Sequence, residues 1–109
     1  MIVEFLIEAE QELLEAAVWY ESKEKYLGVR FRNEVAHIIS RIAEDPLLWR
    51  ELPGGYRSVN CPVFPYYVAY FIRREKIIIA AVAHGHRKPY YWKPRIKKSK
   101  TSNSYHERQ

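Results

Sequence analysis

The chain has 109 residues, a formal net charge of +5 and a hydrophobic content of 48%. This composition suits one folded domain with a small core and excludes a disordered chain. No apolar run approaches the roughly 20 residues of a membrane-spanning helix. The only cysteine, Cys61, excludes an internal disulfide and any multi-cysteine metal site. We therefore expect a cytoplasmic protein without a cofactor.

The first third of the chain predicts a strand followed by two helices. Residues 2–7 are apolar and too short for an isolated helix, so we expect a strand, with no signal segment before it. From Glu8 to about Lys25, apolar residues recur at helical steps between glutamates, which predicts an amphipathic helix. Gly28 is expected to take a positive φ in the turn that follows. A second helix is expected from about Val29 to Glu44, where Asp45-Pro46 ends it.

The short connection between the two helices predicts an antiparallel hairpin. Its expected buried positions are Ala9, Leu13, Ala16 or Ala17, and Tyr20 in the first helix, and Phe31, Val35, Ile38, Ile39 and Ile42 in the second.

The rest of the domain predicts three strands. Tyr56–Asn60 follows a Pro-Gly-Gly turn signal and is short, whereas Tyr66–Ile72 is longer. Residues 73–76 are charged and predict a hairpin loop. Ile77–His84 is apolar on both faces, which indicates the most buried strand. Short loops between these strands imply antiparallel pairing.

These elements predict an α+β fold. The simplest arrangement packs the helical hairpin on one face of a mainly antiparallel, four-stranded sheet. It leaves the opposite sheet face and the strand ends for function. We expect one domain over residues 1–98 and a basic, flexible tail over residues 99–109.

Charge is distributed unevenly along the sequence. Residues 1–46 contain ten acids and five bases, whereas residues 47–109 contain three acids and thirteen bases. The basic second part suggests a nucleic acid or an acidic protein as partner. Improved solubility alone is the alternative.

The stretch that follows the most buried strand, residues 83–92, places cations beside aromatic rings. A buried strand cannot continue through such residues, so the chain must leave the core here. Arginine matches phosphates and carboxylates, and aromatic faces stack on bases. The candidate target-binding residues are Arg57, Arg73, Arg74, Arg87, Lys88, Tyr90, Tyr91 and Trp92. Alternatively, Arg87 pairs with a backbone carbonyl, and Tyr91 and Trp92 pack the tail onto the sheet.

Catalytic and metal sites have weaker signals. His84 and His86 could point the same way from a strand, but no third ligand lies nearby in the sequence, so no metal site is expected. Cys61 lacks the surroundings of a nucleophile and is expected to be a small buried or edge residue. A metal-free ribonuclease would need a base, an acid and cations, which a histidine, a tyrosine, Arg57 and Arg87 could supply.

Several strings in the same order resemble the RelE/ParE superfamily of type II toxins. They span about residues 2–92 and are Ala9-x-x-Glu12-Leu13-x-Glu15-Ala16-x-x-Trp19-Tyr20, Arg30-Phe31-x-x-Glu34-Val35, Ile42-Ala43-Glu44-Asp45-Pro46, Arg57-x-Val59, Phe64-Pro65-Tyr66-x-Val68-x-Tyr70 and Ala81-Val82-Ala83-His84-Gly85-x-Arg87-x-Pro89-x-Tyr91-Trp92. The resemblance implies a toxin that a small cognate antitoxin neutralises in a hetero-oligomeric complex.

The resemblance allows two modes of action. RelE-like members cut mRNA on the ribosome without metal, and here Arg57, His84, Arg87 and Tyr91 would be the catalytic residues. ParE-like members poison DNA gyrase by surface contact. Tyr67 occupies the position where the ribonucleases tend to carry a cation, and the preceding strand has only one cation, Arg57. We therefore favour the ParE-like function, with a decayed toxin that only binds its antitoxin as a third possibility.

Overall fold

A four-stranded sheet with the order β1-β4-β3-β2 forms the centre of the protein. The computed structural model describes residues 1–97, so the predicted tail over residues 99–109 lies outside the described part. The strands are β1 (Ile2–Phe5), β2 (Arg57–Asn60), β3 (Tyr66–Arg73) and β4 (Lys76–His84). β4 pairs in parallel with β1 and antiparallel with β3, and β3 pairs antiparallel with β2. The sheet is thus mainly antiparallel, as predicted.

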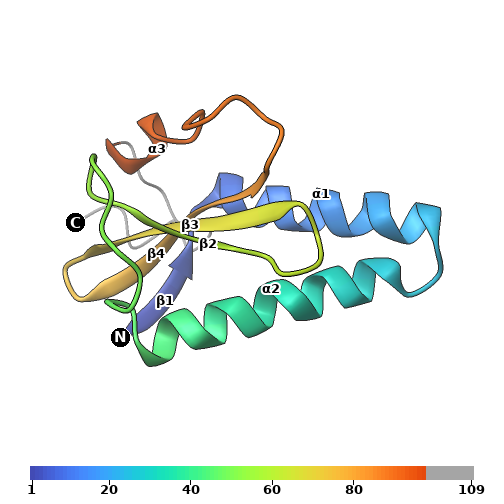
Figure 1. Ribbon diagram of the computed structural model, residues 1–109, viewed down its shortest axis with the longest axis horizontal. Coiled ribbons are helices and arrows are strands. Elements are labelled where there is room, and N and C mark those ends of the chain that lie inside the picture. Colours follow the sequence, from blue (N-terminus) through green and yellow to red (C-terminus); the bar gives the residue numbers. More distant parts are fainter. Residues whose placement is uncertain (98–109) are drawn as a thin grey trace.

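Two helices, α1 (Ile7–Lys23) and α2 (Leu27–Glu44), form an antiparallel hairpin that packs along one side of the sheet (Figure 1). The apolar periodicity of each helix places its stripe against the strands. In α2 the predicted face is confirmed, with Ile39 at its half-buried margin. In α1 the small residues Ala9, Ala16 and Ala17 are buried, and Leu13 and Tyr20 pack beside them.

The turn between the helices differs from its prediction. Tyr26 takes the left-handed conformation, with a φ of 70°, whereas Gly28 lies inside the first turn of α2. A Cβ at Gly28 would lie 2.3 Å from the carbonyl oxygen of Ala17 in α1. Gly28 is therefore needed for the close approach of the two helices and not for an unusual φ. The Glu21 carboxylate accepts hydrogen bonds from the backbone N–H groups of Tyr26 and Gly28 and so supports the left-handed Tyr26.

The predicted hairpin between β3 and β4 is confirmed, but its turn is shorter than expected. Arg73 and Lys76 belong to the strands, and only Arg74 and Glu75 form the connection. Both have positive φ, 53° and 63°, which is the backbone of a two-residue type I′ turn. Residues 77–83 of β4 are fully buried, as the unbroken apolar run predicted.

The chain beyond β4 crosses to the side of the sheet that faces away from α2 and there forms the short helix α3 (Pro94–Lys97), the last described element (Figure 1). The simplest predicted arrangement left this sheet face open, with the alternative that Tyr91 and Trp92 pack the tail onto the sheet. The alternative holds for Trp92, which is 1% exposed, packs its ring on Tyr56 and donates its indole N–H to the Tyr67 hydroxyl. The Trp92 ring thus covers part of this sheet face. The contact is favourable because it removes the large apolar surface of the indole from water.

Candidate functional site

The candidate site forms where β1 ends and leaves one edge of β4 without a strand partner. β1 pairs only with Lys76–Ile79, although β4 continues to His84. Ala80 has no partner in the register of β3, so the strand bulges there. The Ala80 carbonyl and the Val82 N–H both bond to side chains and not to a strand. Buried backbone groups must be paired, so this edge needs side-chain partners.

Glu12 of α1 and Arg95 of α3 supply those partners. Glu12 Oε1 accepts a hydrogen bond of 3.0 Å from Val82 N–H, and Arg95 Nη1 donates to the Ala80 carbonyl at 3.1 Å. The two side chains also form a bidentate ion pair, with distances of 3.1 Å and 2.8 Å. Burial opposes the charge of Arg95, but the hydrogen bonds and charge of Glu12 outweigh it and raise the arginine pKa. The pair thus takes the place of a missing strand segment.

Tyr91 adds a third group to this carboxylate. Its hydroxyl donates to Glu12 Oε2 at 2.6 Å, and burial together with this bond raises the pKa of the phenol. The Arg87 guanidinium lies over the Tyr91 ring, 3.7 Å from the centroid. Arg87 Nη1 is 3.8 Å from Glu12 Oε2, a separation that allows ionic attraction but not a hydrogen bond. Arg87 is therefore held in place by stacking and remains 56% exposed.

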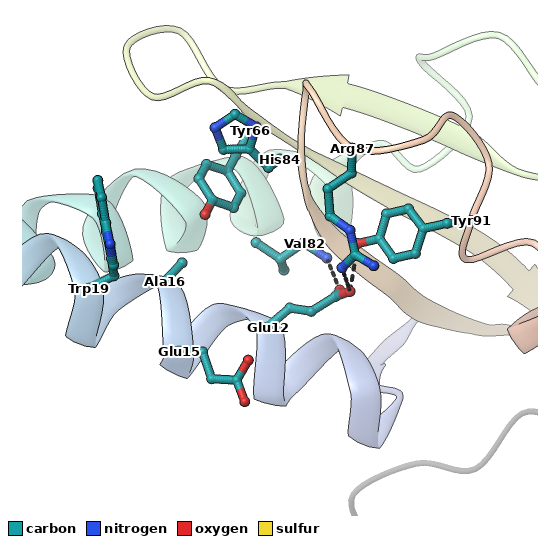
Figure 2. A pocket seen from close by; sticks show the side chains of 9 residues that line it. All are labelled: Glu12, Glu15, Ala16, Trp19, Tyr66, Val82, His84, Arg87 and Tyr91. Atoms are coloured by element: carbon teal, nitrogen blue, oxygen red, sulfur yellow. Dashed lines mark hydrogen bonds and ion pairs between the residues drawn. The ribbon is translucent and has the colours of Figure 1, made fainter.

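Glu12, Arg87 and Tyr91 form one wall of a cleft of about 210 Å³ between α1 and the end of β4, hereafter the α1–β4 cleft. Figure 2 shows Glu12, Arg87 and Tyr91 at one end and Trp19 at the other, with the Tyr66 hydroxyl directed toward α1. The lining residues are Glu12, Glu15, Ala16, Trp19, Tyr66, Val82, His84, Arg87 and Tyr91.

The two histidines of residues 83–92, hereafter the exit segment, form a local turn. The His86 backbone N–H donates to His84 Nδ1 at 3.0 Å, and the rings lie 5.1 Å apart. Within residues 1–97, no group of three histidine, cysteine or carboxylate side chains is arranged to hold a metal ion. His84 lines the α1–β4 cleft, and His86 and Lys88 are exposed beside it.

Other predicted binding residues are divided between different parts of the surface. Tyr90 is exposed, with a φ of 64°, and contributes to a second pocket on the outer sheet face. Trp92, a candidate target-binding residue with packing onto the sheet as the alternative, is buried at the base of that pocket. Arg73 donates to the Ile96 carbonyl and thereby holds α3.

Arg57 does not join the candidate site. It lies on β2, and β3 separates that strand from β4. Its guanidinium donates to the Trp49 carbonyl at 2.7 Å, lies 3.8 Å from Glu51, and is 16% exposed. The four residues predicted as a ribonuclease set are thus not brought together: His84, Arg87 and Tyr91 share one cleft, and Arg57 stabilises the loop before β2.

Cys61 is buried, as predicted. Burial, with a smaller contribution from Glu34, raises the pKa of its thiol to about 12. A thiol with this pKa stays protonated at neutral pH and is a poor nucleophile.

Glu12 and Arg95 were not predicted to be partners, although the sequence contains one signal for Glu12. Glu12 lies three residues after Ala9 and four before Ala16, so it falls on the buried stripe of an otherwise apolar helix face. A charged residue in such a position requires a buried partner. Nothing local identified Arg95 as that partner.

Comparisons with known proteins agree with this fold. A model of the ParE toxin of the type II toxin–antitoxin system parDE matches residues 3–89. A solved structure described as the chromosomal ParDE TA system from P. aeruginosa is 15% identical, with a TM-score of 0.57, covering 77% of this chain and 95% of that chain. At this identity the likeness shows a shared fold. No curated protein sequence matches the chain. Because the family model matches most of the sequence, the chain belongs to the ParE toxin family of type II toxin–antitoxin systems.

Proposed function

We propose that this protein is a growth-arresting toxin that acts on DNA gyrase by surface contact in the cytoplasm and is neutralised by a cognate antitoxin. The match to the ParE toxin family over residues 3–89 carries the proposal. The exposed groups of the exit segment, Arg87, Lys88 and Tyr90, are the candidate target contacts, because they combine positive charge with accessible aromatic surface.

The geometry favours surface contact over mRNA cleavage. Metal-free cleavage needs a base, an acid and cations around one phosphate. Here the Tyr91 hydroxyl is bonded to Glu12 and its pKa is raised, so the phenolate is unavailable as a base. Arg57 is engaged by Trp49 and Glu51, on a strand that does not adjoin β4. The groups that would perform catalysis therefore have structural contacts or lie apart.

Expression of the toxin in a susceptible bacterium tests the proposal. We expect growth arrest with DNA breaks and intact mRNA. Arrest accompanied by codon-phased mRNA cuts and unbroken DNA would instead support the RelE-like ribonuclease, and the absence of arrest would indicate a decayed toxin.

Two variants make the test sharper. Arg87→Ala removes an exposed cation and should weaken toxicity, while the unfolding midpoint stays close to that of the parent. Arg57→Ala removes the hydrogen bond to the Trp49 carbonyl and should lower the unfolding midpoint. At a temperature where this variant stays folded, its toxicity should remain close to that of the parent. If the parent toxin cuts mRNA and both variants lose this cleavage to the same extent, the proposed mode of action is contradicted.

A further inference from the structure

We propose that the α1–β4 cleft binds a carboxylate side chain of a protein partner, with an apolar neighbour of that side chain packed against Trp19. An antitoxin is the partner expected to supply it, so the proposal rests on the proposed function in this one respect. The recognition chemistry itself is independent of the cellular target.

Arg87 provides the main attraction for a carboxylate. Its guanidinium is stacked on Tyr91 and 56% exposed, so its orientation is fixed before a partner arrives. Within residues 1–97 the guanidinium makes an ionic contact with Glu12 at 3.8 Å, which is too long for a hydrogen bond. The oxygens of Glu12 are already taken by Val82, Tyr91 and Arg95. The N–H groups of Arg87 are therefore available for a bidentate bond to a carboxylate.

Two further donors line the same cleft. Because His84 Nδ1 accepts a hydrogen bond from His86 N–H, the neutral His84 ring carries its proton on Nε2. Burial, with contributions from Tyr20 and Glu12, raises the pKa of Tyr66, so its hydroxyl stays protonated and can donate. Figure 2 shows His84 and Tyr66 side by side above α1. Three donors around one cleft suit a carboxylate better than a neutral or cationic group.

The remaining lining favours a protein partner over a nucleic acid. Glu15 lines the cleft, and Glu8 and Glu10 are exposed on the same helix, so a chain of phosphates crossing α1 would be repelled. A single carboxylate on an uncharged segment meets less of this repulsion than a chain of phosphates does, and it can approach Arg87 at the opposite end of the cleft from Trp19. Trp19 is 56% exposed and offers an apolar wall. Tryptophan and arginine are the residue types that contribute most to protein interfaces.

Nuclear magnetic resonance with a short peptide tests this directly. The probe is an acetylated and amidated octapeptide of serine and glycine with one Glu-Leu pair, and the control peptide has Gln-Leu in its place. We expect the Glu peptide to shift the Arg87 side-chain N–H and the Trp19 indole N–H, while the buried Trp92 indole stays unchanged. The Gln peptide should leave all three in place.

Matched variants identify the residues responsible. Arg87→Gln should lower the affinity for the Glu peptide about tenfold or more, because a hydrogen bond to a charged group is lost. Trp19→Ala should weaken binding of the Glu-Leu peptide more than that of a Glu-Ser peptide. Arg50→Gln, at an exposed arginine outside the cleft, should leave the affinity unchanged.

Several outcomes would overturn the proposal. They are equal shifts from the Glu and Gln peptides, an unchanged affinity in a folded Arg87→Gln variant, and no shift at the highest soluble peptide concentration. Shifts caused by inorganic phosphate or a DNA oligonucleotide, but not by the Glu peptide, would reject the protein carboxylate in favour of a nucleic acid. Growth arrest is not a readout, so failure here leaves the gyrase proposal standing. Conversely, a toxin without gyrase activity could still bind the peptide.

Discussion

At the residue scale, Glu12 shows how one carboxylate replaces a missing strand partner. It is 13% exposed and accepts hydrogen bonds from the backbone of β4, from a tyrosine and from an arginine. A buried carboxylate is tolerated only when its lone pairs are satisfied, and here they are. The position of Glu12 on the buried stripe of α1 could be read from the sequence. Its partners could not, because they lie 70 to 83 residues away along the chain.

Glu12→Ala should therefore be strongly destabilising. Glu12 and Arg95 are 13% and 17% exposed, so the loss from removing one member of the pair should lie near the lower end of the range for buried pairs, about 3 kcal/mol in the free energy of unfolding. The variant leaves Arg95 without its carboxylate and the Val82 N–H without its acceptor. Urea unfolding followed by circular dichroism measures it. Glu15→Ala, at an exposed position on the same helix, is the matched control and should change stability by less than about 0.5 kcal/mol. Equal midpoints for the two variants would refute the structural role of Glu12.

At the element scale, the close contact of α1 with α2 depends on Gly28. The sequence indicated a glycine in the interhelical turn, but its role was misassigned, because a positive φ and a tight packing contact are both reasons for glycine. The nearby carbonyl of Ala17, in the other helix, shows that the packing contact is the reason. The position of that carbonyl is set by tertiary packing, so the sequence could not show it.

Gly28→Ala should separate the helices. The added methyl group would lie 2.3 Å from the Ala17 carbonyl oxygen, so the backbone must shift, at a cost of about 1–3 kcal/mol. Gly85→Ala is the control, since its methyl group would meet the Pro65 carbonyl at an ordinary 3.5 Å. Thermal unfolding of both variants tests this, and a Gly85 variant as unstable as the Gly28 variant would argue against a specific steric clash.

The β3–β4 turn carries local strain that a sequence change can relieve. Arg74 and Glu75 both have positive φ, which non-glycine residues adopt at a cost. Replacing them with Asn-Gly, the preferred pair of a type I′ turn, should stabilise the protein by about 1 kcal/mol. Chemical denaturation of the double variant gives the value. An unchanged or lower midpoint would show that the native pair makes compensating contacts.

At the scale of the whole molecule, the burial of Tyr70 and Cys61 should make the protein less stable at alkaline pH. Burial raises the pKa of Tyr70 from 10.0 to about 12 and that of Cys61 from 9.0 to about 12. Nearby Arg57 opposes the shift of Tyr70, and Asp45 adds to it. The unfolded chain therefore loses these protons at lower pH than the folded protein.

Because the neutral forms are favoured in the folded state, these two groups should add no pH dependence to the stability below about pH 9 and should lower the stability as the pH rises from there toward about 12. Melting temperatures recorded across this window test the sign. Tyr70→Phe should make the alkaline decline shallower, although it costs about 1 kcal/mol at neutral pH through the lost bond to the Pro46 carbonyl. Tyr26→Phe, at an exposed position, should leave the decline unchanged. A decline that begins well below pH 9 would point to other groups.

The sequence by itself determined the two long helices, the four strands and the class of fold, but it did not indicate the short helix α3. Apolar periodicity defined the two helices, the unbroken run at 77–82 defined the buried strand, and Asp45-Pro46 marked the helix end, because each of these signals depends on neighbouring residues. Only the tertiary structure decided that Trp92 is buried, that Arg57 is remote from the cleft, and that Glu12 joins Arg95 at the open edge of β4. Each of these outcomes depends on segments that lie far apart in the sequence: the strand order separates Arg57 from β4, Tyr56 and Tyr67 pack against Trp92, and the end of β1 leaves the edge of β4 that Glu12 and Arg95 fill.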